Sequence, residues 1–234
     1  MKKFYLLIAI VMIGNLSKAQ FTKGQKLVGP SLSFGFGDNK FESVSNNQPV
    51  VDKSKSFNVD VGVSSIKMKT ESVGWGVGLN YGFNSFNRNY IQTNISNEKG
   101  NNHSINLSGF KRNFIPIKPK FNFYYDIGAI ASIGFGDGSA TYTNVTPPYS
   151  SVKTNDYGLR TYITPGFTYT IKKNLLIEAA LNNIGSIGYN HSIRKTTTGS
   201  TFEQKTTSSS FNASSTLTAA GLLNNFTFSF KWIL

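Results

Sequence analysis

The two histidines are the first residues to consider for catalysis, because each is followed by a serine. His103 and His191 both lie in the tetrapeptide Asn-His-Ser-Ile. A histidine next to a serine could supply the base and the nucleophile of an esterase or a lipid-modifying enzyme. Both tetrapeptides fall at the ends of expected strands, and adjacent residues of a strand point to opposite faces. The His-Ser pairs therefore cannot meet on one face, and we expect no catalytic residues and no enzyme activity.

Charged residues within alternating segments form a second candidate site. Each lies on the same face of its segment as Gly, Asn or Ser, opposite the large apolar residues. If that face is enclosed, opposite charges on it must pair, because an isolated buried charge is strongly unfavourable. We expect a structural charge network in the lumen, extended by Arg112 or Lys231, rather than a gated ion path or a catalytic acid pair. Its members are Asp60, Asp126, Arg160 and Glu178.

Metal and cofactor chemistry finds little support in the sequence. The chain has no cysteine, which excludes disulfides, thiolate metal sites and a lipid-modified cysteine. Neither histidine has a carboxylate at ligand spacing, so we expect no metal site. The Gly-x-Gly runs at 35–37 and 74–78 are not followed by a helix that could bind a phosphate, so we expect no cofactor.

Alternation of large and small residues predicts that β-strands position these side chains. From Val73 to Phe83 every odd-numbered residue is large and apolar, and every even-numbered residue is Gly or Asn. Successive side chains of a strand point to opposite faces, so one face is apolar and the other is nearly bare. The apolar face could pack on a second layer or contact lipid. Eight segments show the pattern, near 27–37, 57–67, 73–84, 104–115, 121–135, 156–171, 175–189 and 216–234.

The connections between these segments alternate in length. Tight turns are expected near 69–71, 116–119 and 172–174, whereas the other connections are polar and about 18 residues or longer. Outer-membrane barrels have short turns at one end, longer loops at the other and an even number of strands. A sandwich has no reason to keep every second connection short, so the pattern favours an eight-stranded membrane barrel.

Two segments break the alternation. Pro165 cannot donate to a strand ladder, so a bulge is expected at Pro165-Gly166. Ile105 and Leu107 are out of phase with Phe110, which predicts a shift near Gly109.

The N-terminal residues predict export. Residues 2–3 are lysines, 4–13 are apolar, and 17–19 place small residues before Gln20. An apolar run of about 10 residues is too short for a membrane-spanning helix, which needs about 20. We expect a cleaved signal peptide over 1–19 and a barrel domain over 20–234, with both termini in the periplasm.

The net charge of +13, or +10 without the signal peptide, is basic but not clustered in a nucleic-acid-binding motif. We therefore expect no nucleic-acid partner. Lysines gather at the expected periplasmic turns, where each could contribute about 1 kcal/mol of attraction to anionic headgroups. Ordinary snorkelling of lysines at a membrane rim explains them equally well. This predicted basic girdle contains Lys118, Lys120, Lys172 and Lys173.

The chain resembles the small eight-stranded outer-membrane β-barrels of Gram-negative bacteria, the OmpA/OmpX type and related outer-membrane β-barrel domains. The resemblance rests on Ser17-Lys18-Ala19, the strand spacing and the alternating aromatic segment from Phe226 to Leu234. It implies an all-β, antiparallel, up-and-down transmembrane barrel in the outer membrane. It also implies that the barrel-insertion machinery reads the last strand, although this chain ends in Leu234 where the family usually has an aromatic residue.

We therefore expect an integral outer-membrane protein with a structural or surface role, surrounded by outer-membrane lipid. Its outer loops are the candidates for binding a ligand or a partner. A soluble periplasmic carrier barrel would need the reverse arrangement, with apolar residues inside. A rim lipid-modifying enzyme would need His103 or His191. The aromatic residues favour a membrane barrel because they gather near both strand ends, at Tyr81, Phe83 and Phe86 and at Phe110, Phe114, Phe121, Phe123 and Trp232.

Overall fold

The structure, a computed structural model, is all-β and describes residues 21–45, 48–89, 95–142, 149–181, 184–198, 202–215 and 226–234. Its strands are β1 (Lys26–Ser45), β2 (Gln48–Met68), β3 (Val73–Asn89), β4 (Ile95–Lys118), β5 (Phe121–Tyr142), β6 (Tyr149–Lys172), β7 (Leu175–Leu181), β8 (Gly185–Thr198), β9 (Phe202–Ser215) and β10 (Phe226–Ile233). The expected signal peptide lies outside the described residues. No described helix is long and apolar enough to cross a membrane.

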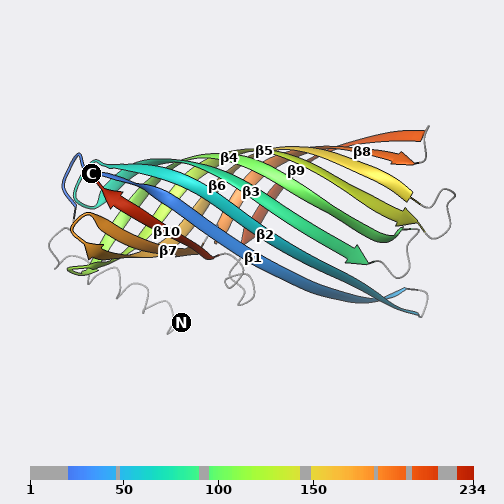
Figure 1. The fold of residues 1–234 in the computed structure, drawn as a ribbon, viewed down its shortest axis with the longest axis horizontal. Helices are drawn as coiled ribbons and strands as arrows, with labels where there is room; N and C mark the ends of the chain where they lie inside the picture. The colour runs from blue at the N-terminus through green and yellow to red at the C-terminus, as the bar shows by residue number, and fades with distance from the viewer. Residues whose placement is uncertain are drawn as a thin grey trace.

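Eight of these strands close into an antiparallel barrel (Figure 1). Strands β1 to β6 pair in chain order, and β7 and β10 complete the ring between β6 and β1. The closing pair is short, because only Leu27–Ser33 of β1 pairs with Thr227–Ile233 of β10. The ring confirms the predicted eight-stranded barrel.

The two ends of the barrel differ in their connections. At one end, which we call the turn end, the tight turns 69–72, 119–120 and 173–174 join β2 to β3, β4 to β5 and β6 to β7. The C-terminus lies at the same end (Figure 1). At the opposite end, the far end, long loops were expected, but strands fill most of that length. Only 46–47 separate β1 from β2, and 90–94 separate β3 from β4.

The seventh predicted segment is divided in the structure. A single strand was expected over 175–189, but β7 ends at Leu181 and β8 begins at Gly185. β8 and β9 form a separate hairpin on the far-end half of β6. Residues 202–215 were expected in a loop because they are rich in Ser and Thr, yet threonine also favours strands. Of the predicted last strand, 216–225 lie outside the described residues.

Pro165 lies beside the break between β7 and β8 rather than in a bulge. Its strand pairs with β5 without a register shift. On the other side, β6 pairs with β8 up to Ile163 and with β7 from Gly166, so Pro165 has no strand partner there among the residues that the structure describes. Proline lacks the N–H that a continuous neighbouring strand would require. The predicted bulge is wrong, because the interruption of the neighbouring strand accommodates the proline instead.

Strand β4 continues through Gly109 without the predicted change of phase. Ile105, Leu107 and Gly109 are exposed and face outward. Phe110 and Phe114 are buried and face inward, so they do not belong to an outward aromatic belt. Because large apolar residues occur on both faces of this strand, its sequence pattern looks like a change of phase. The pairing of β4 with β3 and β5 is nevertheless continuous here.

Glycines of the inner face lie directly across from large inward side chains. Gly166 pairs with Tyr124, and a Cβ at Gly166 would lie 2.5 Å from the Tyr124 ring. Phe110 lies between Gly76 and Gly128 on the two neighbouring strands. The glycines on the inward face therefore leave space beside them, and large inward side chains of the adjacent strands fill that space.

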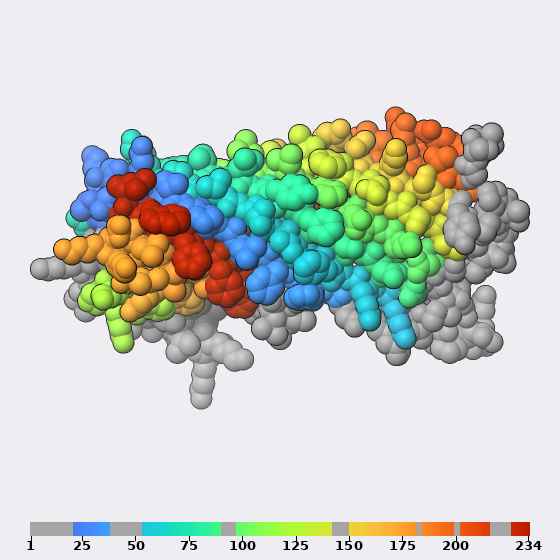
Figure 2. Space-filling view, viewed as in Figure 1, coloured from blue at the N-terminus to red at the C-terminus, as the bar shows by residue number. Residues whose placement is uncertain are grey.

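The outward face of the barrel carries a continuous apolar band. On β3 the side chains of Trp75, Val77, Leu79 and Tyr81 are between 42% and 61% exposed. The neighbours of Leu79 and Tyr81 on β2 and β4 are also apolar and exposed, and Figure 2 shows successive segments of the chain packed side by side on one face of the molecule. These neighbours are Val61, Val63, Ile105 and Leu107. Soluble proteins rarely expose an apolar surface of this extent, whereas a membrane barrel presents such a band to lipid.

Replacing Gly166 with alanine is expected to destabilise the barrel by about 1–3 kcal/mol, because the added methyl group would displace the buried Tyr124 ring. Gly109→Ala is the matched control, because a Cβ at Gly109 meets no atom within 4 Å. Urea unfolding in lipid vesicles measures both variants. Equal stability of the two would contradict the packing role of Gly166.

Candidate functional site

Apolar side chains close the lumen at the turn end. Leu27, Ile66 and Leu176 point inward from β1, β2 and β7 and have no exposed surface. Phe21, which precedes β1, is buried among them and its ring centroid lies 4.6 Å from that of Phe114. The sequence predicted a lumen face of small and polar residues, so this apolar seal is a correction. The alternation of large and small residues shows which side chains share a face of a strand. It cannot show that near the turn end the inward face is apolar as well as the outward face.

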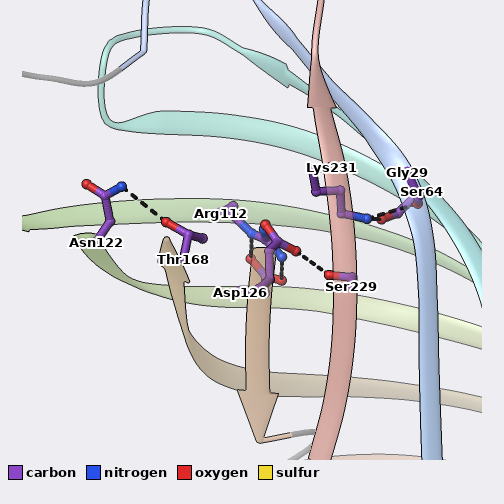
Figure 3. A network of polar contacts seen from close by, with 9 residues as sticks. Gly29, Ser64, Arg112, Asn122, Asp126, Thr168, Ser229 and Lys231 are labelled. Carbon is purple, nitrogen blue, oxygen red and sulfur yellow. Dashed lines mark hydrogen bonds and ion pairs between the residues drawn. The ribbon is translucent and has the colours of Figure 1, made fainter. Parts of the chain in front are cut away.

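Arg112 binds two carboxylates next to this seal (Figure 3). Its Nε and Nη2 donate hydrogen bonds to the two oxygens of Asp126, at 2.7 and 2.8 Å. Its Nη1 donates to Oε1 of Glu178. All three side chains are at most 7% exposed. The guanidinium fork can satisfy both carboxylates at once, which an ammonium group could not do with the same geometry.

Aromatic rings fix the position of the Arg112 guanidinium. Its Cζ lies 3.8 Å from the centroid of the Tyr124 ring and 5.7 Å from those of Phe110 and Phe114. A cation over an aromatic face is attracted to it, and the attraction is stronger away from water. Phe110 and Phe114 therefore contact the guanidinium of Arg112, which lies between them on the same strand.

Strand β10 completes this cluster as it closes the ring. Ser229 Oγ donates to Oε2 of Glu178 at 2.8 Å. Lys231 Nζ donates to the carbonyl oxygen of Gly29 at 3.1 Å and to Ser64 Oγ (Figure 3). Lys231 is also buried here. The two positive charges of Arg112 and Lys231 therefore balance the two negative charges of the carboxylates, and the cluster has no net charge. Buried charge is tolerated in this way, because each group has a partner.

A polar cavity of about 200 Å³ adjoins the cluster. Asp60 and Arg160, two members of the predicted network, line it. Between the described residues, no ion pair joins either of them to Arg112, Asp126 or Glu178. The structure therefore brings Asp126 and Glu178 together through Arg112, while the other two predicted members face the cavity.

Sequence reasoning named Arg112 only as an extension of the network, whereas in the structure Arg112 joins its two carboxylates. Its signal was present in the sequence: it shares the parity of Phe110 and Phe114, which contact it. A basic residue between two aromatic residues of the same face could have marked a buried cation.

A second ion pair crosses the interior near the far end. Arg194 Nη2 of β8 lies 2.8 Å from Glu98 Oε1 of β4, although β5 and β6 separate these strands in the sheet. Arg88 Nη1 lies 3.9 Å from the other oxygen of Glu98. The curled sheet thus brings Glu98 and Arg194 together on its inner face beyond the cavity.

Each histidine contacts side chains of the neighbouring strands. The ring nitrogen Nδ1 of His103 is 2.5 Å from the Tyr81 hydroxyl, and its ring contacts those of Phe83 and Phe135. His191 Nδ1 is 2.9 Å from Ser209 Oγ. In the part of the chain that the structure describes, no group of three or more acidic residues or histidines could hold a metal ion.

The predicted basic girdle consists of exposed residues at the turn end. Lys118 and Lys120 flank the β4–β5 turn, and Lys172 and Lys173 flank the β6–β7 turn. Their attraction to anionic headgroups stays a prediction.

Comparison with known proteins supports the barrel fold. No protein-family model and no curated protein matches the sequence. The outer membrane protein OprG from Pseudomonas aeruginosa is similar in structure, with a TM-score of 0.52 and 12% identity over 93% of this chain and 99% of that chain. A major outer membrane protein from Thermus thermophilus has a TM-score of 0.42 and 14% identity, over 90% of this chain and 99% of that chain.

Ail, the attachment invasion locus protein of Yersinia pestis, aligns with a TM-score of 0.33 and 12% identity, over 91% of this chain and 96% of that chain. Identities this low show the fold alone. The chain therefore has the fold of small outer-membrane β-barrels. Together with the exposed apolar band, this fold is that of a barrel whose outward face contacts lipid.

Replacing Arg112 with methionine is expected to destabilise the barrel by about 3–5 kcal/mol, because Asp126 and Glu178 would remain buried without a partner. The quadruple variant Arg112→Met, Asp126→Leu, Glu178→Met, Lys231→Met is expected to recover most of that loss, because it removes all four buried charges of the cluster. Urea unfolding in vesicles compares the two variants. A quadruple variant less stable than the single one would contradict this account.

Proposed function

We propose that this protein is a non-enzymatic surface barrel of the outer membrane, whose function lies in the part of the strands beyond the apolar band. We call this part the extension: the far-end portions of β1 to β6 together with the β8–β9 hairpin. The observation that carries the proposal is the closed lumen, because an apolar seal and a paired charge cluster occupy the interior where an open pore would pass.

Strand length supports a role for the extension. Strands β4 and β6 each contain 24 residues. A transmembrane β-strand needs only about 9–11 residues. More than half of each strand is therefore available outside the hydrocarbon, and a barrel that served only as an anchor would not need it.

Within the extension, the far-end portions of β2, β4 and β6 carry polar residues, as expected for strands in water. Lys55, Lys99 and Lys153 are exposed on its outward face. On the inward face, Asp156 and Glu98 continue the polar character of the cavity. A sheet with two wetted faces is suited to contact other molecules rather than to enclose an apolar ligand.

The orientation in the membrane forms part of the proposal. Removal of a signal peptide over 1–19 would leave the turn end and both termini in the periplasm and the extension on the cell surface. The even strand number and the short turns on one side support this orientation. Membership of the OmpA/OmpX type, and reading of the last strand by the insertion machinery, are supported by the same features and by the aromatic residues of β10.

The soluble carrier barrel is less well supported. A carrier for an apolar ligand needs an apolar cavity and a polar exterior. The described cavity is instead lined by groups such as Asp60, Asn80 and Arg160, and the described exterior carries the apolar band.

Replacing Leu107 with arginine is expected to reduce the stability of the inserted barrel by about 2–4 kcal/mol, because this side chain lies in the middle of the outward band. The control Asn101→Arg changes an exposed, outward residue of the same strand beyond the band, where the cost is small. Folding titrations in lipid vesicles measure both. Equal tolerance of the two arginines would indicate that the band does not face lipid.

Cysteine labelling tests the orientation, because the chain has no cysteine of its own. We expect Gln204→Cys, exposed on β9, to react with a membrane-impermeant maleimide on intact cells. Lys173→Cys, exposed in a tight turn at the other end, should react only after the outer membrane is opened. The reverse labelling pattern would place the extension in the periplasm and reject a surface role.

A further inference from the structure

The outward face of the β8–β9 hairpin is apolar and aromatic near Ile187 and basic near Lys195, toward the far end. Its cross-strand pairs begin with Ile187 and Ala213, followed by Tyr189 and Phe211. The exposed pair of Lys195 and Lys205 follows six residues further along each strand. Hydrocarbon, interface and headgroup follow one another in the same order across a membrane leaflet.

Three lysines lie in a row across neighbouring strands of this face. Lys153 of β6 pairs directly with Lys195 of β8, and Lys195 pairs directly with Lys205 of β9. All three are exposed and share the outward parity of their strands. Neighbouring strands are about 4.8 Å apart, so the row spans about 10 Å. We call these three residues the lysine row.

Like charges directly opposite one another destabilise a sheet. The nearby acidic residues only partly offset the row: Glu203 Oε1 lies 3.1 Å from Lys195 Nζ, and Asp137 is the cross-strand partner of Lys153. On the inner face at a similar height, by contrast, Arg194 is paired with Glu98. The three lysines of the row thus outnumber these two acidic residues on the outward face, and an anion could lie between neighbouring ammonium groups.

We propose that the lysine row binds the phosphate groups of lipid headgroups in the leaflet that surrounds the far end of the barrel. The inference rests on the proposed membrane insertion and goes beyond it by assigning a ligand to a particular surface. Each lysine adds attraction to an anionic membrane surface, and three in a row present a phosphate with more than one donor.

The arrangement favours a lipid over a dissolved polyanion. The row lies on the same face and the same two strands as Tyr189 and Phe211, which are 49% and 75% exposed and suited to the membrane interface. Six residues of strand cover about 20 Å. The tilt of barrel strands, about 40°, shortens this height, and long lysine side chains can turn back toward the interface. One phospholipid can therefore contact the aromatic pair and the row together.

The test compares two double variants of the full-length, exported protein. Lys195→Gln/Lys205→Gln removes two members of the row. Lys55→Gln/Lys99→Gln removes the same charge from exposed, outward lysines whose strands are separated by β3 at Asn87. Phosphatidic acid is titrated into each protein in zwitterionic detergent micelles, and native mass spectrometry measures the bound lipid.

We expect the first variant to bind phosphatidic acid about tenfold or more weakly, and the second to bind nearly as the unaltered protein does. Equal losses in both variants, or no loss in either, would overturn the assignment. Heparin provides a soluble polyanion: if it binds through the row while phosphatidic acid does not, the partner is not a lipid and the proposal is wrong. Heat-modifiable gel migration in phosphatidylcholine vesicles reports insertion separately, so failure of the barrel proposal is distinguishable from failure of this one.

Discussion

The small interior of an eight-stranded ring is the constraint on which the rest of the structure depends. Such a barrel is just wide enough for side chains to fill it. Large inward residues therefore need bare positions beside them, and Tyr124 opposite Gly166 shows how the strands supply them. The same shortage of space brings Arg112 against Asp126, Glu178 and an aromatic ring, where the charges are shielded from water. Packing and electrostatics thus close the lumen together.

Much of the fold could be predicted because lipid on one side and a narrow interior on the other impose a strict period of two. Residues 73–83 display this period without exception, and the ring and its tight turns followed from such segments. The prediction failed where both faces have the same character. Phe110 and Leu107 are both apolar but face opposite sides, and residues 202–215 are mostly polar and exposed along the whole strand, so they show no alternation.

The candidate site was only partly predictable for a related reason. Parity placed Asp126 and Glu178 on the inner face, but it cannot tell which inward residues lie at the same height around a ring. That height depends on the stagger between strands. Arg112 rather than Arg160 meets the two carboxylates because the registers of β4, β5 and β7 bring them level.

The break beside Pro165 has a consequence for how the chain can evolve. Strands β7 and β10 complete the ring on the turn-end side of this break, and the β8–β9 hairpin is attached to the rest through β6. Closure of the ring therefore does not depend on the residues of the hairpin. The hairpin residues can therefore vary in sequence while the pairs of β10 with β1 and β7, which complete the ring, are kept.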